Sequence, residues 1–184
     1  MERYWQSATA TAEVYRVVGS DRRRVLELED PTPDQVARML DVFRDSFAGE
    51  PGFRYMFTNP ERRLADVRWA AGLKFALLRD RLRVFVAGPA IEGFSWWIPP
   101  GRTPFATFAE QIRAGYGWAP VRCGPWSFLR MFRFSSQERD LIAHYTSRPV
   151  WVLDAIAVDL SLGRRGLGGR LLEPGLRAAR RSGH

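Results

Sequence analysis

The sequence predicts an α/β fold in which helices flank a mixed sheet within one domain. Its 184 residues are 46% hydrophobic, which is enough for a substantial core. Two segments with helical spacing each begin at a capping residue followed by proline, and several short apolar runs bounded by turn residues have the length of strands. The charged fraction of 26% is ordinary and argues against disorder of the whole chain.

The N-terminal part is expected to contain an extension, a strand and a helix. Residues 1–20 show no helical period, so we expect them to form a loose extension before a domain over 21–184. Residues 25–28 have the pattern of a first strand. The following helix is expected to begin after Thr32, a good N-cap that precedes a proline, and to end near residue 47.

A second capped helix and a pair of strands occupy the middle of the chain. Asn59 is followed by proline and glutamate, and the apolar residues after it recur at helical spacing to about residue 79. Strands are expected over 82–87 and 91–98, and Pro-Pro-Gly ends the second of them. The less regular part that follows has helical patterns near residues 105–114, 125–134 and 136–145.

A strand, a glycine-rich loop and a helix near the C-terminus carry the strongest functional signal. Residues 150–158 form an apolar run with the length of a central strand, and Gly163-Arg164-Arg165-Gly166-Leu167-Gly168-Gly169 then leads into a leucine-rich helix. Free N–H groups and the dipole at a helix N-terminus attract phosphate, and glycines let it approach the backbone. The pattern therefore predicts a phosphate site. The alternative is a glycine-rich turn that only caps the helix.

The spacing of this loop does not fit two common nucleotide-binding motifs. A nucleoside-triphosphate loop requires a lysine and a serine or threonine after its last glycine, and neither is present here. The dinucleotide fingerprint requires Gly-x-Gly-x-x-Gly early in a βαβ unit, and the order here is different.

The segment instead resembles the acetyl-CoA loop of the GNAT superfamily of N-acetyltransferases. That motif, Gln/Arg-x-x-Gly-x-Gly/Ala, follows a strand that ends in Ala-Val, and the match covers Ala157-Val158, Gly166-Leu167-Gly168 and Leu171-Leu172. The run from Leu172 to Ala179 is similar to relatives of puromycin N-acetyltransferase. Pro174, which those relatives share, is expected to kink the last helix.

The resemblance implies a mostly antiparallel central sheet with a helical insertion between the third and fourth predicted strands. In such proteins a fifth strand, a helix and closing strands follow the last helix. The sequence ends at His184, about where the fifth strand would begin, so we expect a fragment of the fold that lacks its C-terminal strands. The exposed edge of strand 150–158 would then favour self-association.

The resemblance also implies an enzyme that moves an acetyl group from acetyl-CoA to an amine of a small molecule by direct attack on the thioester. Backbone groups of Ile156, Ala157 and Val158 would pair with the pantetheine arm, and an amide near Val158 would stabilise the oxyanion. The backbone amides expected to hold the pyrophosphate are those of Arg164, Arg165, Gly166, Leu167, Gly168 and Gly169.

Two carboxylates are candidates for the general base. Asp154 lies on the predicted central strand near the expected thioester, and Glu92 on strand 91–98 is the second candidate. For Asp154 the alternative is an ordinary hydrogen-bonded residue of the strand. Neither His144 nor His184 has a partner at metal-ligand spacing, so no metal is expected.

Composition leaves other functions open. The net charge of +8 favours an alternative as a basic nucleic-acid-binding module, although no nucleic-acid-binding motif is present, and a catalytically inactive acetyl-CoA-binding fragment is a third possibility. A single cysteine and the lack of a secretory signal suggest a cytoplasmic protein. No apolar run approaches the roughly 20 residues of a membrane span, so no membrane partner is expected.

Overall fold

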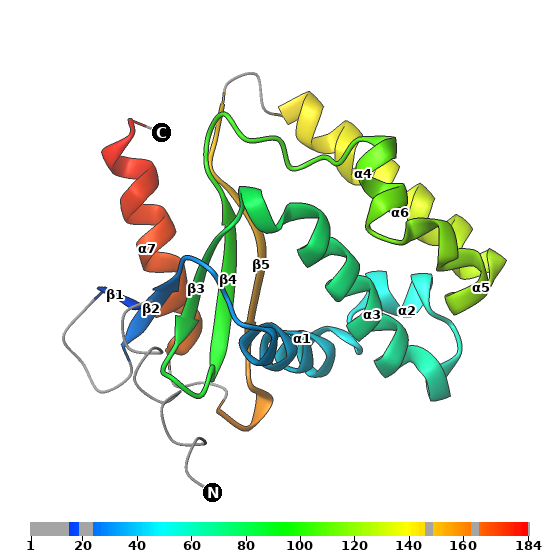
Figure 1. Cartoon of the computed structure of the whole chain (residues 1–184), viewed down its shortest axis with the longest axis horizontal. Helices are drawn as coiled ribbons and strands as arrows, with labels where there is room; N and C mark the ends of the chain where they lie inside the picture. Colours follow the sequence, from blue (N-terminus) through cyan, green and yellow to red (C-terminus); the bar gives the residue numbers. More distant parts are fainter. Residues whose placement is uncertain (1–14, 19–23, 146–148, 163–165, 184) are drawn as a thin grey trace, which may run out of the picture.

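The computed structural model describes residues 15–18, 24–145, 149–162 and 166–183, and its strands form one sheet (Figure 1). The sheet has five strands in the order of the chain, and every pairing is antiparallel. This agrees with the expected mostly antiparallel sheet. The strands are β1 (Tyr15–Val18), β2 (Val25–Leu28), β3 (Arg83–Ala87), β4 (Gly93–Ile98) and β5 (Val152–Val158).

Strand β1 differs from the loose extension predicted over residues 1–20. It pairs with β2 from Tyr15 opposite Leu28 to Val18 opposite Val25. This pairing with β2 is what identifies it as a strand. The rest of the predicted extension lies outside the described residues.

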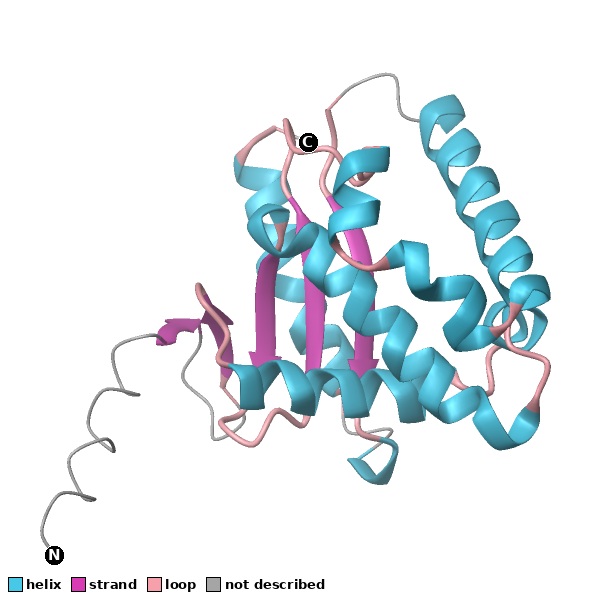
Figure 2. Cartoon of the chain, turned by 45° about the vertical axis from the view of Figure 1, so that its right-hand side comes forward, coloured by secondary structure: helices cyan, strands magenta, loops and turns pink. Residues whose placement is uncertain are grey.

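Helices cover both faces of the sheet. Helices α1 and α3 lie on one face and α7 on the other (Figures 1 and 2). As predicted, α1 and α3 begin at caps, because the side chains of Thr32 and Asn59 accept hydrogen bonds from backbone N–H groups of the first turn. The longer helices are α1 (Pro33–Phe47), α3 (Pro60–Leu78), α6 (Pro125–Tyr145) and α7 (Leu167–Arg181). None of the described helices combines the length and the apolar composition that a bilayer crossing requires.

The insertion between β4 and β5 is helical, as expected, but its elements differ from the predicted ones. The pieces predicted near 125–134 and 136–145 form one continuous helix, α6. The helix predicted near 105–114 is present, whereas the short helices at Pro51–Met56, before the insertion, and at Ala119–Cys123 were not predicted. The short elements are α2 (Pro51–Met56), α4 (Phe108–Arg113), α5 (Ala119–Cys123) and the 3-10 turns η1 (Arg79–Arg81), η2 (Tyr116–Trp118) and η3 (Leu160–Leu162).

Strand β4 is buried on both faces, which explains its aromatic sequence. Toward α1 and α3, Trp96 packs on Phe43 and Phe75, with ring centroids 5.9 and 5.3 Å apart. Toward α7, Trp97 belongs to a second cluster that includes Leu171. Successive side chains of a strand point to opposite faces, so one short strand contributes to two cores.

The predicted kink site, Pro174, lies inside α7, where a buried hydroxyl satisfies a carbonyl of the preceding turn. The Ser95 hydroxyl donates to the Leu171 carbonyl at 2.8 Å, and Trp97 Nε1 donates to Ser95 Oγ at 3.2 Å. Proline lacks an N–H group and disturbs the helix ladder before it. The N–H group missing at position 174 would have bonded the Arg170 carbonyl, so the Ser95 hydrogen bond to Leu171 does not replace it but fastens α7 to β4.

Candidate functional site

Asp154 lies at an irregularity of β5. Trp96 is opposite Ala155 and Trp97 is opposite Leu153, so Asp154 is the extra residue of a β-bulge. The Asp154 side chain is only 5% exposed. A bulge redirects a side chain and often accompanies a functional site, so the position of this carboxylate calls for a specific explanation.

The Asp154 carboxylate belongs to a cluster of polar side chains from three further elements. Lys74 Nζ of α3 lies 3.0 Å from Asp154 Oδ1 and 3.8 Å from Glu138 Oε1 of α6. Asp154 Oδ2 is buried and has no hydrogen-bond partner. Buried carboxylate oxygens normally have one. This oxygen is therefore an unsatisfied acceptor that protein atoms enclose.

The charges in this cluster control its protonation. Burial lowers the pKa of Lys74, but the carboxylates of Asp154 and Glu138 outweigh it, so that pKa is raised above its ordinary value. Burial raises the pKa of Tyr116 in η2, and the charge of Lys74 opposes this only in part. At neutral pH the cluster therefore contains an ammonium group and a protonated phenol.

The outer edge of β5 presents free backbone groups. Asp159 N–H donates to the Glu92 carbonyl at 2.8 Å, and pairs of residues two apart along an antiparallel ladder are equivalent. Ala157 therefore hydrogen-bonds to Phe94, while Ile156 and Val158 direct their N–H and C=O groups away from β4. No described strand pairs with this edge. The Val158 carbonyl accepts a hydrogen bond from the Ser46 hydroxyl of α1 at 3.0 Å.

Asp159 fixes the beginning of the loop that follows β5. It accepts hydrogen bonds from Arg38 Nη2 at 2.6 Å and from the Ser161 hydroxyl at 2.7 Å. The Ser161 hydroxyl, together with Arg38, lowers the pKa of Asp159 to about 2. The carboxylate is therefore ionised at neutral pH, and the loop leaves the sheet from a position anchored to α1.

The glycines at the start of α7 leave space beside the backbone. Gly166 has a φ of 72° and is the N-cap, where a β-carbon would be strained. Among the described residues, an added β-carbon at Gly166, Gly168 or Gly169 would meet no atom within 4 Å apart from its chain neighbours and the backbone of its own helix. Leu167 instead buries its side chain in the core beneath α7, leaving only its backbone for a ligand. Gly163, Arg164 and Arg165 lie outside the described residues.

Glu92, the second candidate base, lies immediately before β4, at the end of the sheet near Asp159. Its backbone carbonyl accepts the Asp159 hydrogen bond, and its side-chain Oε2 is buried without a hydrogen-bond partner. Two candidate carboxylates thus retain unused acceptor atoms. Of these two, Asp154 is the one that forms an ion pair within the part of the chain that the structure describes. Among the residues that the structure describes, no group of three or more His, Cys, Asp or Glu side chains could hold a metal ion.

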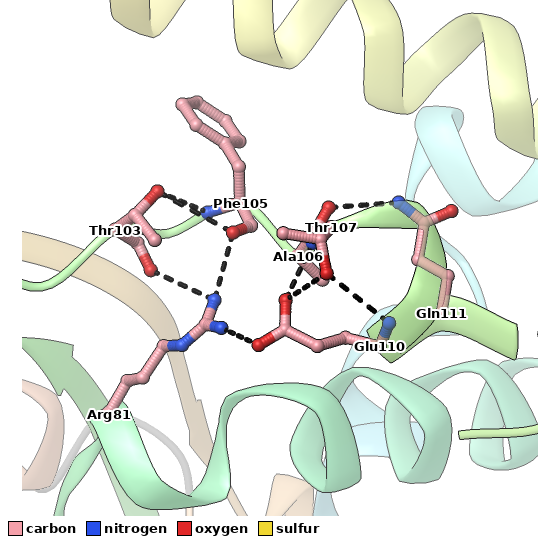
Figure 3. Close-up of polar contacts among 7 residues, drawn as sticks. All are labelled: Arg81, Thr103, Phe105, Ala106, Thr107, Glu110 and Gln111. Carbon is pink, nitrogen blue, oxygen red and sulfur yellow. Dashed lines mark hydrogen bonds and ion pairs between the residues drawn. The ribbon is translucent and has the colours of Figure 1, made fainter. Parts of the chain in front are cut away.

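Salt bridges fasten the insertion to the rest of the fold. Figure 3 shows Arg81 of η1 donating to the carboxylate of Glu110 and, at 2.8 Å, to the Phe105 carbonyl. Glu110 also accepts the Thr107 N–H at 2.6 Å, completing the capping box of α4. These hydrogen bonds, those from Thr107 first, lower the pKa of Glu110 to about 2.

We expect Glu110→Gln to remove a pH-dependent part of the stability. Because the pKa of Glu110 is lowered on folding, its contribution is complete above its unfolded pKa of about 4.3 and is lost as pH falls toward 2. The difference in urea midpoint between wild type and Glu110→Gln should therefore narrow from pH 6 to pH 3. Glu173→Gln, an exposed control on α7, should show less change. A constant difference for Glu110→Gln would contradict this assignment.

The sequence did not identify several residues that the structure adds to the site. Lys74 contacts Asp154 from a distant part of the chain, Glu138 in turn contacts Lys74, and Arg38 and Ser46 hold the end of β5. The one available signal was composition, since Lys74 is the only lysine among 28 lysine and arginine residues.

No protein-family model matches the chain, and no curated protein matches it. Among solved structures, the chain is similar to a crystal structure from Corynebacterium glutamicum ATCC 13032 described as histone acetyltransferase HPA2 and related acetyltransferase. The two share 20% sequence identity with a TM-score of 0.54, and the alignment covers 84% of this chain and 70% of that one. The chain therefore has a GNAT-like fold, as the sequence predicted.

Proposed function

We propose that this chain transfers an acetyl group from acetyl-CoA to an amine of a small molecule by direct attack on the thioester. The fold similarity to a protein described as an acetyltransferase supports acyl transfer. The observation that carries the proposal is the combination of a free edge on β5 with a glycine-lined helix N-terminus directly after it. A ligand with an amide-containing arm and a pyrophosphate has the chemistry to bind both.

The residues after Val158 are suited to that ligand. Ile156 offers its outward N–H and C=O groups and Val158 its outward N–H group to an extended arm, since the Val158 carbonyl already accepts the Ser46 hydroxyl, and Ala157 keeps the strand attached to β4. Gly166, Gly168 and Gly169 leave room for phosphate oxygens to approach the N-terminus of α7, where the helix dipole is favourable. Arg164 and Arg165 would add positive charge at the same place.

Asp154 is the residue that we propose to accept the proton of the attacking amine. Of the two candidate carboxylates, Asp154 is the one on β5. Its oxygen Oδ2 has no hydrogen-bond partner in the protein. Its second oxygen is held by Lys74 at 3.0 Å, which fixes its direction. An amine positioned beside Oδ2 could lose its proton while it attacks the thioester carbonyl. The thiolate of CoA leaves without a covalent enzyme intermediate.

Calorimetric titration with acetyl-CoA tests the proposal first. We expect the wild type to bind and Arg164→Ala/Arg165→Ala to bind about tenfold or more weakly, because two charge-assisted contacts to phosphate are lost. Gly169→Ala should also bind more weakly, because its β-carbon occupies the open space next to the helix N-terminus. At the same time it should stabilise the fold by about 0.5–1 kcal/mol, because alanine is the better helix former.

The outcomes separate the candidate functions. Binding together with release of free CoA thiol in the presence of an amine would support the transferase, whereas binding without turnover would support the acetyl-CoA-binding alternative. A folded chain that does not bind should be compared with one extended past His184. Binding restored by the extension would mean that further strands complete the site, and no binding by either chain would refute the proposal.

A further inference from the structure

The polar cluster around Asp154 contains a residue that the proposed reaction does not yet explain. Lys74 is the only lysine in a chain whose other 27 basic residues (28 minus this one) are arginine. Its ammonium nitrogen lies 3.0 Å from the buried Asp154 carboxylate, and its side chain is 34% exposed. An ammonium is a compact charge that fits beside one carboxylate oxygen, whereas a guanidinium is broader and tends to engage both oxygens.

The two oxygens of the Asp154 carboxylate have different surroundings. Oδ1 is bound by Lys74, and Oδ2 is buried with no partner. A cation on one oxygen offsets part of the desolvation of a buried carboxylate and limits its rotation, while the other oxygen has no protein partner. Lys74 thus acts on Asp154 without occupying the oxygen that a substrate would need.

Lys74 also connects Asp154 to the helical insertion. Glu138 of α6 lies 3.8 Å from the same ammonium, and its side chain is 45% exposed. Among the described residues, the titratable groups that interact with Lys74 of α3 are Asp154 of β5, Glu138 of α6 and Tyr116 of η2. The residues of β4 on either side of the bulge, Trp96 and Trp97, do not titrate.

We propose that Lys74 is a positioning residue for acetyl transfer, which holds Asp154 charged and oriented so that Oδ2 receives the proton of the acceptor amine. This inference rests on the proposed function. It goes beyond it by assigning a role to a side chain that neither the motif nor the strand–loop–helix pattern includes. Lys74 is not itself the acetyl acceptor, because its ammonium is held in the protonated form by two carboxylates.

The pH dependence of kcat/KM for wild type, Lys74→Arg and Lys74→Met tests this role. In Lys74→Met we expect the acidic limb of the profile to move to higher pH by about 1–2 units, because burial disfavours a charged carboxylate that has lost its counter-ion. In Lys74→Arg, which keeps a positive charge, that limb should stay at its wild-type position, even if the broader guanidinium lowers kcat/KM. Glu138→Gln leaves the closer ion pair intact and should move the limb by less than half as much as Lys74→Met.

Urea unfolding of two variants tests the ion pair independently of activity. The urea midpoint of Lys74→Met should fall, and that of Lys74→Met/Asp154→Asn should recover toward wild type, because the double variant no longer buries an unpaired charge. Equal midpoints for the single and double variants would overturn the ion pair without any reference to turnover. An active wild type whose profile is unchanged in Lys74→Met would overturn the positioning role alone.

Intact-mass measurement after incubation with acetyl-CoA provides the last test, and comparison with Lys74→Arg distinguishes the single lysine from the N-terminal amine. No acetylated Lys74 is expected. Acetylation at Lys74 that Lys74→Arg abolishes would overturn the positioning role, since the residue would then be a substrate. A wild type that turns over no amine would refute the proposed function and this role with it.

Discussion

Asp154→Asn is expected to reduce kcat/KM for acetyl transfer by about 10²–10⁴-fold, the range for loss of a general base. The amide has nearly the shape of the carboxylate but cannot accept the amine proton. The affinity for acetyl-CoA should stay within about threefold of wild type, because the proposed contacts to that ligand come from the edge of β5 and the N-terminus of α7. Steady-state kinetics together with calorimetric titration would measure both quantities.

Two carboxylate variants are suitable controls for this result. Asp140→Asn changes an exposed carboxylate of α6 and should leave kcat/KM unchanged. Glu92→Gln tests the other candidate, whose buried Oε2 also lacks a partner. If Asp154→Asn retained activity and Glu92→Gln lost it, the proton acceptor would be Glu92 and the role of the β5 bulge would have to be revised.

Gly175→Ala is expected to destabilise the fold by about 3 kcal/mol, near the upper end of the range for overpacking a core. A β-carbon at this position would lie 2.2 Å from Cε2 of the Trp97 ring. That ring is 4% exposed and surrounded by the core beneath α7, so it has little room to move. Urea unfolding would show the change as a lower midpoint with an unchanged slope.

Gly169→Ala is the matched control for the same substitution in the same helix. Nothing lies within 4 Å of its added β-carbon, so this variant should gain stability where Gly175→Ala loses it. If Gly175→Ala were as stable as wild type, α7 would have to shift away from β4. The hydrogen bond from Ser95 to the Leu171 carbonyl, 2.8 Å in wild type, would then lengthen.

Patterns confined to a few neighbouring residues were sufficient for much of the fold. The capping residues Thr32 and Asn59 placed the starts of α1 and α3 correctly. The apolar run near the C-terminus predicted β5, and a helix was expected after the glycine-rich loop, but α7 begins at Leu167 and includes Gly168 and Gly169 in its first turn. Cap chemistry and hydrophobic spacing act over one or two turns, so a single sequence carries enough information to recognise them.

The sequence by itself thus determined the class of fold, most of its long elements and the glycine-rich start of α7. The tertiary structure decided what surrounds Asp154: the bulge that turns it toward α3, the ammonium of Lys74 at 3.0 Å and the approach of Glu138 from the insertion. It also decided which of the three residues at the end of β5 face outward. A register depends on the partner strand, and an ion pair between residues 80 positions apart (154 minus 74) leaves no local pattern.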